Sequence, residues 1–178
     1  MLTFLVGGAR SGKSTLAVAL GSRHDGPVTF VATAEAFDDD LRARIAAHRA
    51  ERPGWPTVEV PVELADAVRA APHTAMLIVD CLTVWVGNLF HHRPTADDRV
   101  AAYDALLDAL AARTARGAPT VVVSNEVGLG LHPDTSLGRE YRDELGRLNQ
   151  RVAAVATRSL LLVAGRALPL VDPWEALT

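Results

Sequence analysis

The fold of this chain is indicated by Gly7-Gly8-Ala9-Arg10-Ser11-Gly12-Lys13-Ser14, a stretch that fits the phosphate-binding pattern G-x-x-x-x-G-K-[ST]. The apolar run at 2–6 precedes it and is typical of a buried strand. The residues that follow, 13–23, place Leu16 and Leu20 at helical spacing. Strand, glycine turn and helix are the context in which this pattern forms a P-loop. We therefore predict a P-loop, the alternative being a glycine-rich turn that binds nothing.

The residue types in this stretch suit a chain of phosphates. Glycines at both ends of the loop let the backbone bend where a Cβ would clash, so successive N–H groups can point at phosphate oxygens. Lys13 would add a cation at the β- and γ-phosphates, and the Ser14 hydroxyl would be a ligand for Mg²⁺. We expect nucleotide contacts from the whole loop, namely Gly7, Gly8, Ala9, Arg10, Ser11, Gly12, Lys13 and Ser14.

Length and composition favour one domain with an ordinary core. The chain has 178 residues, 49% of them hydrophobic, so we expect a single P-loop domain over residues 1–178. The 18 basic and 21 acidic residues are interleaved, which disfavours nucleic acid as a partner. The only cysteine, Cys81, suits a reducing compartment. The N-terminal run is far shorter than a membrane span and lacks a basic leader, so we expect a cytoplasmic protein without a membrane anchor.

Further apolar runs predict the architecture. Residues 28–32 read as a second buried strand, and a strand–helix–strand unit of this length implies a right-handed crossover between parallel strands. The predicted fold class is α/β, with a mainly parallel, RecA-like sheet flanked by helices. Thr33, Ala34 and Glu35 follow the carboxyl end of the second strand, where open α/β sheets place their ligands.

Other polar groups follow strands in the same way. The apolar run at 75–80 ends in Asp80, as in a Walker B strand, and we predict that Asp80 orients Mg²⁺ through its water shell. The alternative is an aspartate that only caps the next turn. A strand at 120–124 leads into Asn125-Glu126-Val127-Gly128. Glu59 lies in a short strand at 57–60 and is a solvated carboxylate unless the site is near.

His48 is the candidate for nucleophilic chemistry. Apolar side chains in 41–49 recur at helical spacing and place His48 on the inward stripe, with Arg44 and Arg52 one turn to either side. A histidine on an apolar face is usually a partly buried core residue. Nearby cations, however, disfavour imidazolium and leave a neutral ring nitrogen able to attack. The spacing leaves both roles open.

Two long helices are predicted at 97–116 and 136–157. The expected buried stripe of the first is Val100, Tyr103, Leu107 and Leu110. That of the second is Leu137, Tyr141, Leu145, Leu148, Val152 and Val155. We expect a surface loop at 91–94, a last core strand at 159–164 and a short tail at 169–178.

Six stretches together resemble one known family. They are GGARSGKS at 7–14, VATAE at 31–35, RIAAHR at 44–49, the acid that ends VD at 79–80, SNEVGLG at 124–130 and GRLNQR at 146–151. The set resembles the bifunctional adenosylcobinamide kinase / adenosylcobinamide-phosphate guanylyltransferase family of cobalamin biosynthesis. The resemblance covers nearly the whole chain in order and spacing, and its combination of motifs is specific where the P-loop alone is not.

The resemblance implies two reactions. A nucleoside triphosphate, ATP or GTP, phosphorylates the aminopropanol hydroxyl of adenosylcobinamide, and GMP then passes from GTP to adenosylcobinamide phosphate to give adenosyl-GDP-cobinamide. In the family a histidine is transiently guanylylated, and His48 is the matching position. The family often has a second histidine just before it, where this chain has Ala47.

The resemblance also implies the site residues. Lys13 and His48 would be catalytic, and Ser14 and Asp80 would hold Mg²⁺. Nucleotide contacts would come from the P-loop and from Thr33, Ala34, Glu35, Arg49, Ala50, Glu51, Arg52, Glu59 and Asp80. The family tends to form trimers with sites at subunit boundaries, so a homotrimer is expected.

Two other functions remain open from the residues themselves. One is a P-loop kinase for an ordinary small metabolite, with a structural His48. The other is a nucleotide-dependent switch or a filament subunit of the RecA type. No N-K-x-D guanine motif follows the late strand, since 125–128 reads Asn-Glu-Val-Gly, which argues against a GTPase switch. The mild acidity argues against a filament that acts on DNA.

Overall fold

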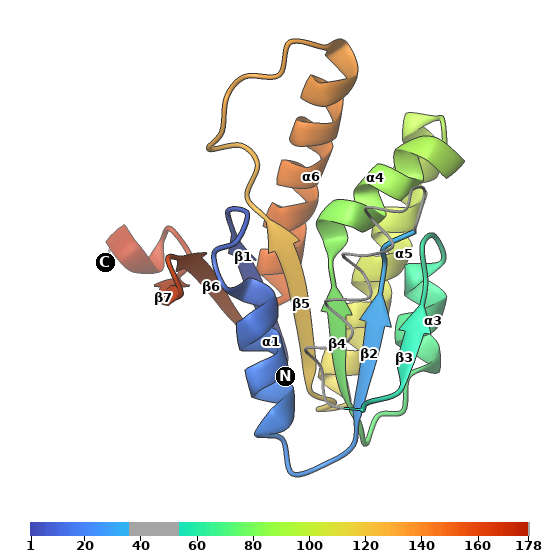
Figure 1. The fold of residues 1–178 in the computed structure, drawn as a ribbon, viewed down its shortest axis with the longest axis vertical. Helices are drawn as coiled ribbons and strands as arrows, with labels where there is room; N and C mark the ends of the chain where they lie inside the picture. The colour runs from blue at the N-terminus through green and yellow to red at the C-terminus, as the bar shows by residue number, and fades with distance from the viewer. Residues whose placement is uncertain (36–53, 178) are drawn as a thin grey trace.

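The computed structural model describes residues 1–35 and 54–177. The described strands form one sheet in the order β3-β2-β4-β5-β1-β6-β7 (Figure 1). All neighbouring strands are parallel except β6 and β7, which are antiparallel. The strands are β1 (Leu2–Gly7), β2 (Val28–Ala32), β3 (Thr57–Glu59), β4 (Met76–Asp80), β5 (Thr120–Asn125), β6 (Arg158–Val163) and β7 (Arg166–Leu170).

Helices cover both faces of this sheet (Figure 1). One core cluster joins α1 to one face, and a larger one joins the other α-helices to the opposite face. The helices are α1 (Lys13–Ser22), α3 (Leu64–Ala70), α4 (Leu82–His92), α5 (Ala96–Ala115), α6 (Ser136–Val155) and the short 3-10 helix η1 (Glu175–Leu177). The α/β class and the mainly parallel sheet that the sequence predicts are confirmed.

The continuous apolar runs of the central strands follow from this two-sided cover. In β1, Phe4 and Val6 belong to the larger cluster, whereas Leu5 packs against α1. In β4, Val79 belongs to the larger cluster and Ile78 to the cluster that includes α1. Successive side chains of a strand point to opposite faces, so a strand covered on both sides needs apolar residues at nearly every position.

The register of the strands brings the predicted polar positions to one edge. Gly7 at the end of β1 pairs with Asn125 in β5, and Ala32 in β2 pairs with both Asp80 and Glu59. Since the strands are parallel, their carboxyl ends meet at the same edge. The P-loop, the residues after β2 and the acid that ends β4 are therefore neighbours.

The buried stripe of α5 differs from the prediction. Val100 is 46% exposed, whereas the preceding residue, Arg99, is buried. The Arg99 guanidinium is paired inside the protein, so Arg99 is buried where Val100 was expected. Tyr103, Leu107 and Leu110 are buried as predicted. Leu137 is also exposed, because it lies in the first turn of α6, which extends beyond the sheet (Figure 1).

Two chain segments have different structures from those predicted. His91 and His92 belong to the last turn of α4 and not to a loop, because the buried side of the helix continues to Leu89 beneath them. The segment predicted as a tail begins inside β7, which pairs Pro169 with Leu160. Proline lacks an N–H group but is tolerated in this edge strand.

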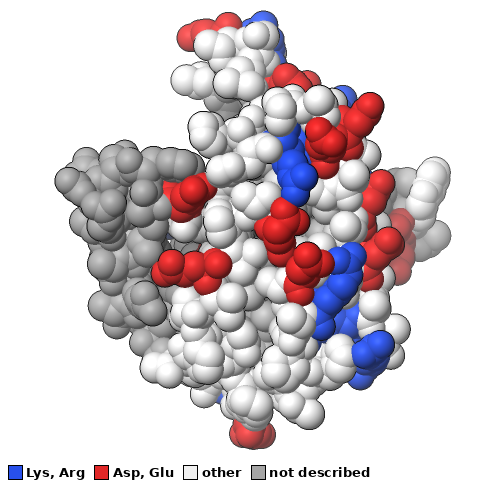
Figure 2. Space-filling view, turned by 90° about the vertical axis from the view of Figure 1, so that its right-hand side faces the viewer, with Lys and Arg blue, Asp and Glu red and all other residues white. Residues whose placement is uncertain are grey.

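Charged side chains of both signs lie among one another on the face that Figure 2 presents. Exposed ion pairs elsewhere in the described residues include Arg69–Asp66, at 2.8 Å. Within the described ranges, no helix combines the length and apolar character that crossing a bilayer requires.

A buried ionic network joins α5 to α6. The Arg99 Nε donates to Glu144 Oε2 at 3.0 Å, its second terminal nitrogen donates to Glu144 Oε1 at 2.7 Å, and the Tyr103 hydroxyl donates to Glu144 Oε2 at 2.7 Å. Burial acts to raise the pKa of Glu144, but the hydrogen bonds from Arg99 and Tyr103 outweigh it, and the pKa lies below its ordinary value. The carboxylate therefore stabilises the folded state.

Replacing Glu144 with glutamine is expected to lower the free energy of unfolding by about 3 kcal/mol at neutral pH, because the buried Arg99 loses its main counter-ion. A lowered carboxyl pKa stabilises the fold above the unfolded-state pKa, near 4.5, and this stabilisation disappears as the pH falls through the folded-state value. The difference between wild type and Glu144→Gln should thus shrink below pH 4.5 in urea titrations.

Asp104→Asn is the matched control, because Asp104 forms an exposed pair with Arg151 between the same two helices. It should cost less than about 1 kcal/mol. Equal losses in the two variants, or a Glu144→Gln loss that persists unchanged at low pH, would contradict the network's role.

Candidate functional site

The P-loop connects β1 to α1 at the carboxyl edge of the sheet. Two of its glycines are required by their surroundings. A Cβ on Gly7 would lie 2.3 Å from the Leu162 carbonyl oxygen of the neighbouring strand. Gly12, which caps α1, has a left-handed backbone with φ of 99°. The loop can therefore curl tightly and direct its amides and the start of α1 toward an anion.

The turn of the β6–β7 hairpin packs against this loop. The Gly165 N–H donates to the Ser11 carbonyl at 3.0 Å, and the Gly165 Cα would lie 3.3 Å from a Cβ on Gly12. The sequence analysis missed this contact because it ended the last strand before Gly165. A glycine between two apolar runs is a hairpin signal that could have indicated it.

Lys13 points into the loop that precedes it. Its Nζ donates to the Gly8 carbonyl at 2.6 Å and to Ser11 Oγ at 3.3 Å, and the residue is only 6% exposed. Burial lowers the pKa of Lys13, while the nearby Asp80 carboxylate acts in the opposite direction. The Lys13 amine is therefore held in the loop where it can bind phosphate oxygens.

Thr33 ties the end of β2 to the end of β4. Its hydroxyl donates to the Cys81 carbonyl at 2.8 Å and accepts from the Cys81 N–H at 2.9 Å. The Thr33 N–H also donates to the Asp80 carbonyl at 3.3 Å. Thr33 is fully buried, so its hydroxyl fixes the segment that carries Asp80. Burial and the Asp80 charge raise the pKa of Cys81 to about 11, which keeps it a thiol.

A second network fixes the end of β5, and the sequence analysis did not single out its side chains. The Asn125 N–H donates to Thr83 Oγ1 at 2.7 Å, and the Asn125 carbonyl accepts from Asn149 Nδ2 at 3.0 Å. The Tyr141 hydroxyl donates to the Thr83 carbonyl at 3.0 Å. The bond between Asn125 and Asn149 connects the stretches SNEVGLG and GRLNQR, so their joint presence in the sequence was the available signal.

The remaining predicted contacts are spread along the edge. Glu35 pairs with His92, the last residue of α4, at 2.9 Å. Because α4 is roughly 15 Å long, this pair lies away from the end of the helix that follows Asp80. Ala34 is half-buried, and Glu59 is exposed at the end of β3, on the far side of β2 from the P-loop. The Glu35 side chain is thus paired with the end of α4.

Five predicted site residues fall outside the described ranges. They are His48, Arg49, Ala50, Glu51 and Arg52. The catalytic and nucleotide-binding roles predicted for them stay predictions.

Two oxygen donors are available for Mg²⁺. Ser14 lies in the first turn of α1 directly after Lys13, and Asp80 ends β4 near the Lys13 amine. Mg²⁺ usually keeps several waters and takes one or two protein oxygens beside substrate phosphates, which this pair fits. No cluster of three or more His, Cys, Asp and Glu side chains in residues 1–35 and 54–177 could hold a metal by itself.

The fold is similar to that of solved structures that share little sequence identity with this chain. An ATPase from the type III secretion system of pathogenic bacteria superposes with a TM-score of 0.53 over 98% of this chain and 59% of that chain, at 12% identity. A Pyrococcus horikoshii protein solved as Project ID PH0250 gives a TM-score of 0.54 over 94% of this chain and 84% of that chain, at 7% identity. At these identities the likeness concerns the fold alone.

Sequence relatives are more informative. The "Bifunctional adenosylcobalamin biosynthesis protein CobP" of Pseudomonas aeruginosa is 41% identical, covering 96% of this chain and 97% of the relative. The CobU proteins of Salmonella typhimurium and Escherichia coli, with the same description, are 39% and 37% identical over 93% of this chain and 97% of each relative. Residues 3–170 match the family described as "Cobinamide kinase / cobinamide phosphate guanyltransferase". This chain therefore belongs to the cobinamide kinase / cobinamide phosphate guanyltransferase family.

Proposed function

We propose that this chain phosphorylates the aminopropanol hydroxyl of adenosylcobinamide and then transfers GMP from GTP to the resulting phosphate, giving adenosyl-GDP-cobinamide. The observation that carries the proposal is the buried Lys13 amine, held inside a P-loop and electrostatically coupled to Asp80, in a chain of this family. ATP or GTP would serve the first reaction and GTP the second. The reactions would take place in the cytoplasm.

The kinase step needs a held triphosphate and an acceptor hydroxyl in line with its γ-phosphorus. The loop amides and the start of α1 would hold the phosphate chain, and Lys13 would balance charge on the β- and γ-phosphates. Ser14 and Asp80 would hold Mg²⁺, which supplies further charge neutralisation when bound. The hydroxyl oxygen forms the new O–P bond, the nucleoside diphosphate leaves, and the hydroxyl proton passes to solvent or a nearby base.

The transfer step would use His48 as a nucleophile. A neutral ring nitrogen attacks the α-phosphorus of GTP and pyrophosphate leaves, giving a histidine–GMP phosphoramidate. The phosphate of adenosylcobinamide phosphate then displaces the histidine. Support for His48 comes from its match to the family motif and from the flanking arginines in the sequence. Arg49, Ala50, Glu51 and Arg52 would contact the nucleotide in this step.

The proposal extends to a homotrimer. Large apolar side chains are exposed in β7 and the residues after it, including Leu168 at 57%, Trp174 at 77% and Leu177 at 75%. Exposed apolar side chains gathered in one segment are typical of an interaction surface. An association of copies would remove them from water.

Lys13→Ala is expected to reduce both reactions by about a hundredfold or more, because each needs the triphosphate to be held and its charge balanced. Initial rates with labelled ATP and labelled GTP would measure the two steps. Arg116→Ala, which removes an exposed cation elsewhere, should leave both unchanged. Loss of one activity with the other intact would indicate separate nucleotide sites and contradict the shared P-loop.

His48→Ala should remove the protein–GMP adduct and the guanylyl transfer while some corrinoid phosphorylation survives, since that step needs no protein nucleophile. The wild-type adduct formed with α-labelled GTP should be labile in acid and comparatively stable in base, as a phosphoramidate is. Undiminished labelling of a folded His48→Ala protein would refute the assignment. It would instead favour a P-loop kinase with a structural histidine.

The assembly is expected to have a mass of three times 19.0 kDa in solution. Light scattering coupled to size-exclusion chromatography measures this mass directly. A monomeric mass across micromolar concentrations would exclude the trimer.

A further inference from the structure

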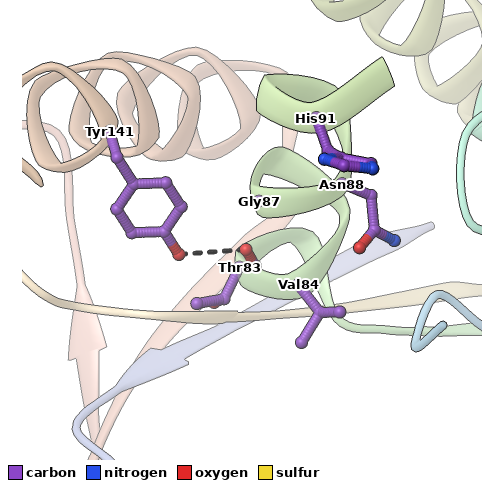
Figure 3. A pocket seen from close by; sticks show the side chains of 6 residues that line it. All are labelled: Thr83, Val84, Gly87, Asn88, His91 and Tyr141. Carbon is purple, nitrogen blue, oxygen red and sulfur yellow. Dashed lines mark hydrogen bonds between the residues drawn. The ribbon is translucent and has the colours of Figure 1, made fainter. Parts of the chain in front are cut away.

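A cavity of about 550 Å³ opens between α4 and α6 at the carboxyl edge of the sheet. Its lining comprises Thr83, Val84, Gly87, Asn88, His91 and Tyr141. The first five lie along one side of α4 at helical spacing, and Figure 3 shows Tyr141 reaching from α6 toward Thr83 at the start of α4. This volume is within the range of small-molecule sites.

The cavity adjoins the P-loop through a short chain of contacts. Its base is Thr83, whose hydroxyl accepts from Asn125, and Asn125 pairs with Gly7 at the start of the P-loop. Its helix, α4, begins at Leu82, two residues after Asp80. Lys13 reaches the β- and γ-phosphates in a P-loop and lies near Asp80 here. Because α4 begins next to Asp80 and Asp80 lies near the Lys13 amine, an acceptor bound along α4 would approach the γ-phosphate from the start of that helix.

The lining of the cavity is rigid where it meets the sheet. Asn88 is buried, and its Nδ2 donates to the Thr33 carbonyl at 2.7 Å and the Pro61 carbonyl at 3.0 Å. Tyr141 is held by its bond to the Thr83 carbonyl, and burial raises its pKa to about 12, so the hydroxyl stays protonated. These bonds fix the two walls relative to the strand ends.

The chemistry of the lining selects a neutral ligand. Among the described residues, the six that form the cavity carry no carboxylate, amine or guanidinium, and they offer Val84, the Tyr141 ring and the bare backbone side of Gly87 as apolar contact. A triphosphate would find no lysine or arginine among these six residues, whereas a neutral amide arm that ends in a hydroxyl could pack against them.

From these observations we infer that the cavity between α4 and α6 seats the aminopropanol amide arm of the cobinamide acceptor and directs its hydroxyl toward the P-loop. The inference rests on the proposed function and adds the residues that bind its second substrate. The corrin ring remains outside the cavity, and Gly87 leaves room for the arm.

Gly87 provides the test, because a Cβ added there meets no atom within 4 Å and the residue sits inside a helix. Alanine and leucine at this position should fill the cavity progressively without disturbing the core, and replacing glycine with alanine in a helix favours folding. The KM for adenosylcobinamide should rise from wild type to Gly87→Ala to Gly87→Leu, by roughly tenfold or more for leucine. The Kd for GDP, measured by calorimetry, should stay constant.

Gly146→Leu is the matched control, since Gly146 is also a helical glycine with no atom within 4 Å of an added Cβ and lies outside the cavity. It should leave the KM unchanged. An unchanged KM in Gly87→Leu overturns the inference. So does a weaker GDP affinity in that variant, which would assign the cavity to the nucleotide, or a changed mass in that variant alone, which would assign it to a subunit contact. Failure of the wild type to phosphorylate adenosylcobinamide would instead refute the proposed function.

Discussion

The position of the P-loop depends on the close approach of two backbones, Gly7 in β1 and Leu162 in β6. A side chain at Gly7 would overlap the Leu162 carbonyl, so only glycine lets β1 run between β5 and β6 to its last residue. This contact fixes the position along the sheet at which the P-loop begins. The β6–β7 turn packs against the loop through the Gly165 N–H, which donates to the Ser11 carbonyl. Displacement of either strand would move the phosphate-binding amides.

The other strand ends are aligned with this loop by polar side chains that act on backbone groups. Thr33 joins β2 to the segment after β4, and Thr83 joins the start of α4 to β5. Asn88 connects α4 back to the ends of β2 and β3 through two carbonyls. Each of these side chains satisfies a backbone donor or acceptor that the strands leave unpaired where they stop. The edge is thereby rigid on the α4 side, where the acceptor substrate would meet the nucleotide.

Much of this arrangement could be predicted because it follows from local patterns. The P-loop motif, the buried runs and the acid at the end of β4 each specify a strand end, and parallel pairing brings strand ends together. Val100 was wrongly predicted to be buried, and the burial of Arg99 in its place depends on Glu144, which is 45 residues away in sequence. Likewise, the bonds between the Thr33 hydroxyl and Cys81 could not be predicted, because the two residues are 48 positions apart in sequence. The chemistry of a side chain can be predicted from its residue type, but its hydrogen-bond partner depends on which segments the fold brings together.

Lys13 is the only lysine in the sequence. Apart from the histidines, all other basic side chains are arginines. The protein thus contains a single ε-amine, and the fold places it inside the P-loop with 6% exposure and a lowered pKa. The Met1 amino group lies at the opposite end of β1. Amine-directed acylation at Lys13 and at Met1 would therefore report on two positions separated by one strand. The extent of modification at Lys13, relative to Met1 in the same molecule, would measure access to the phosphate-binding loop without any introduced label.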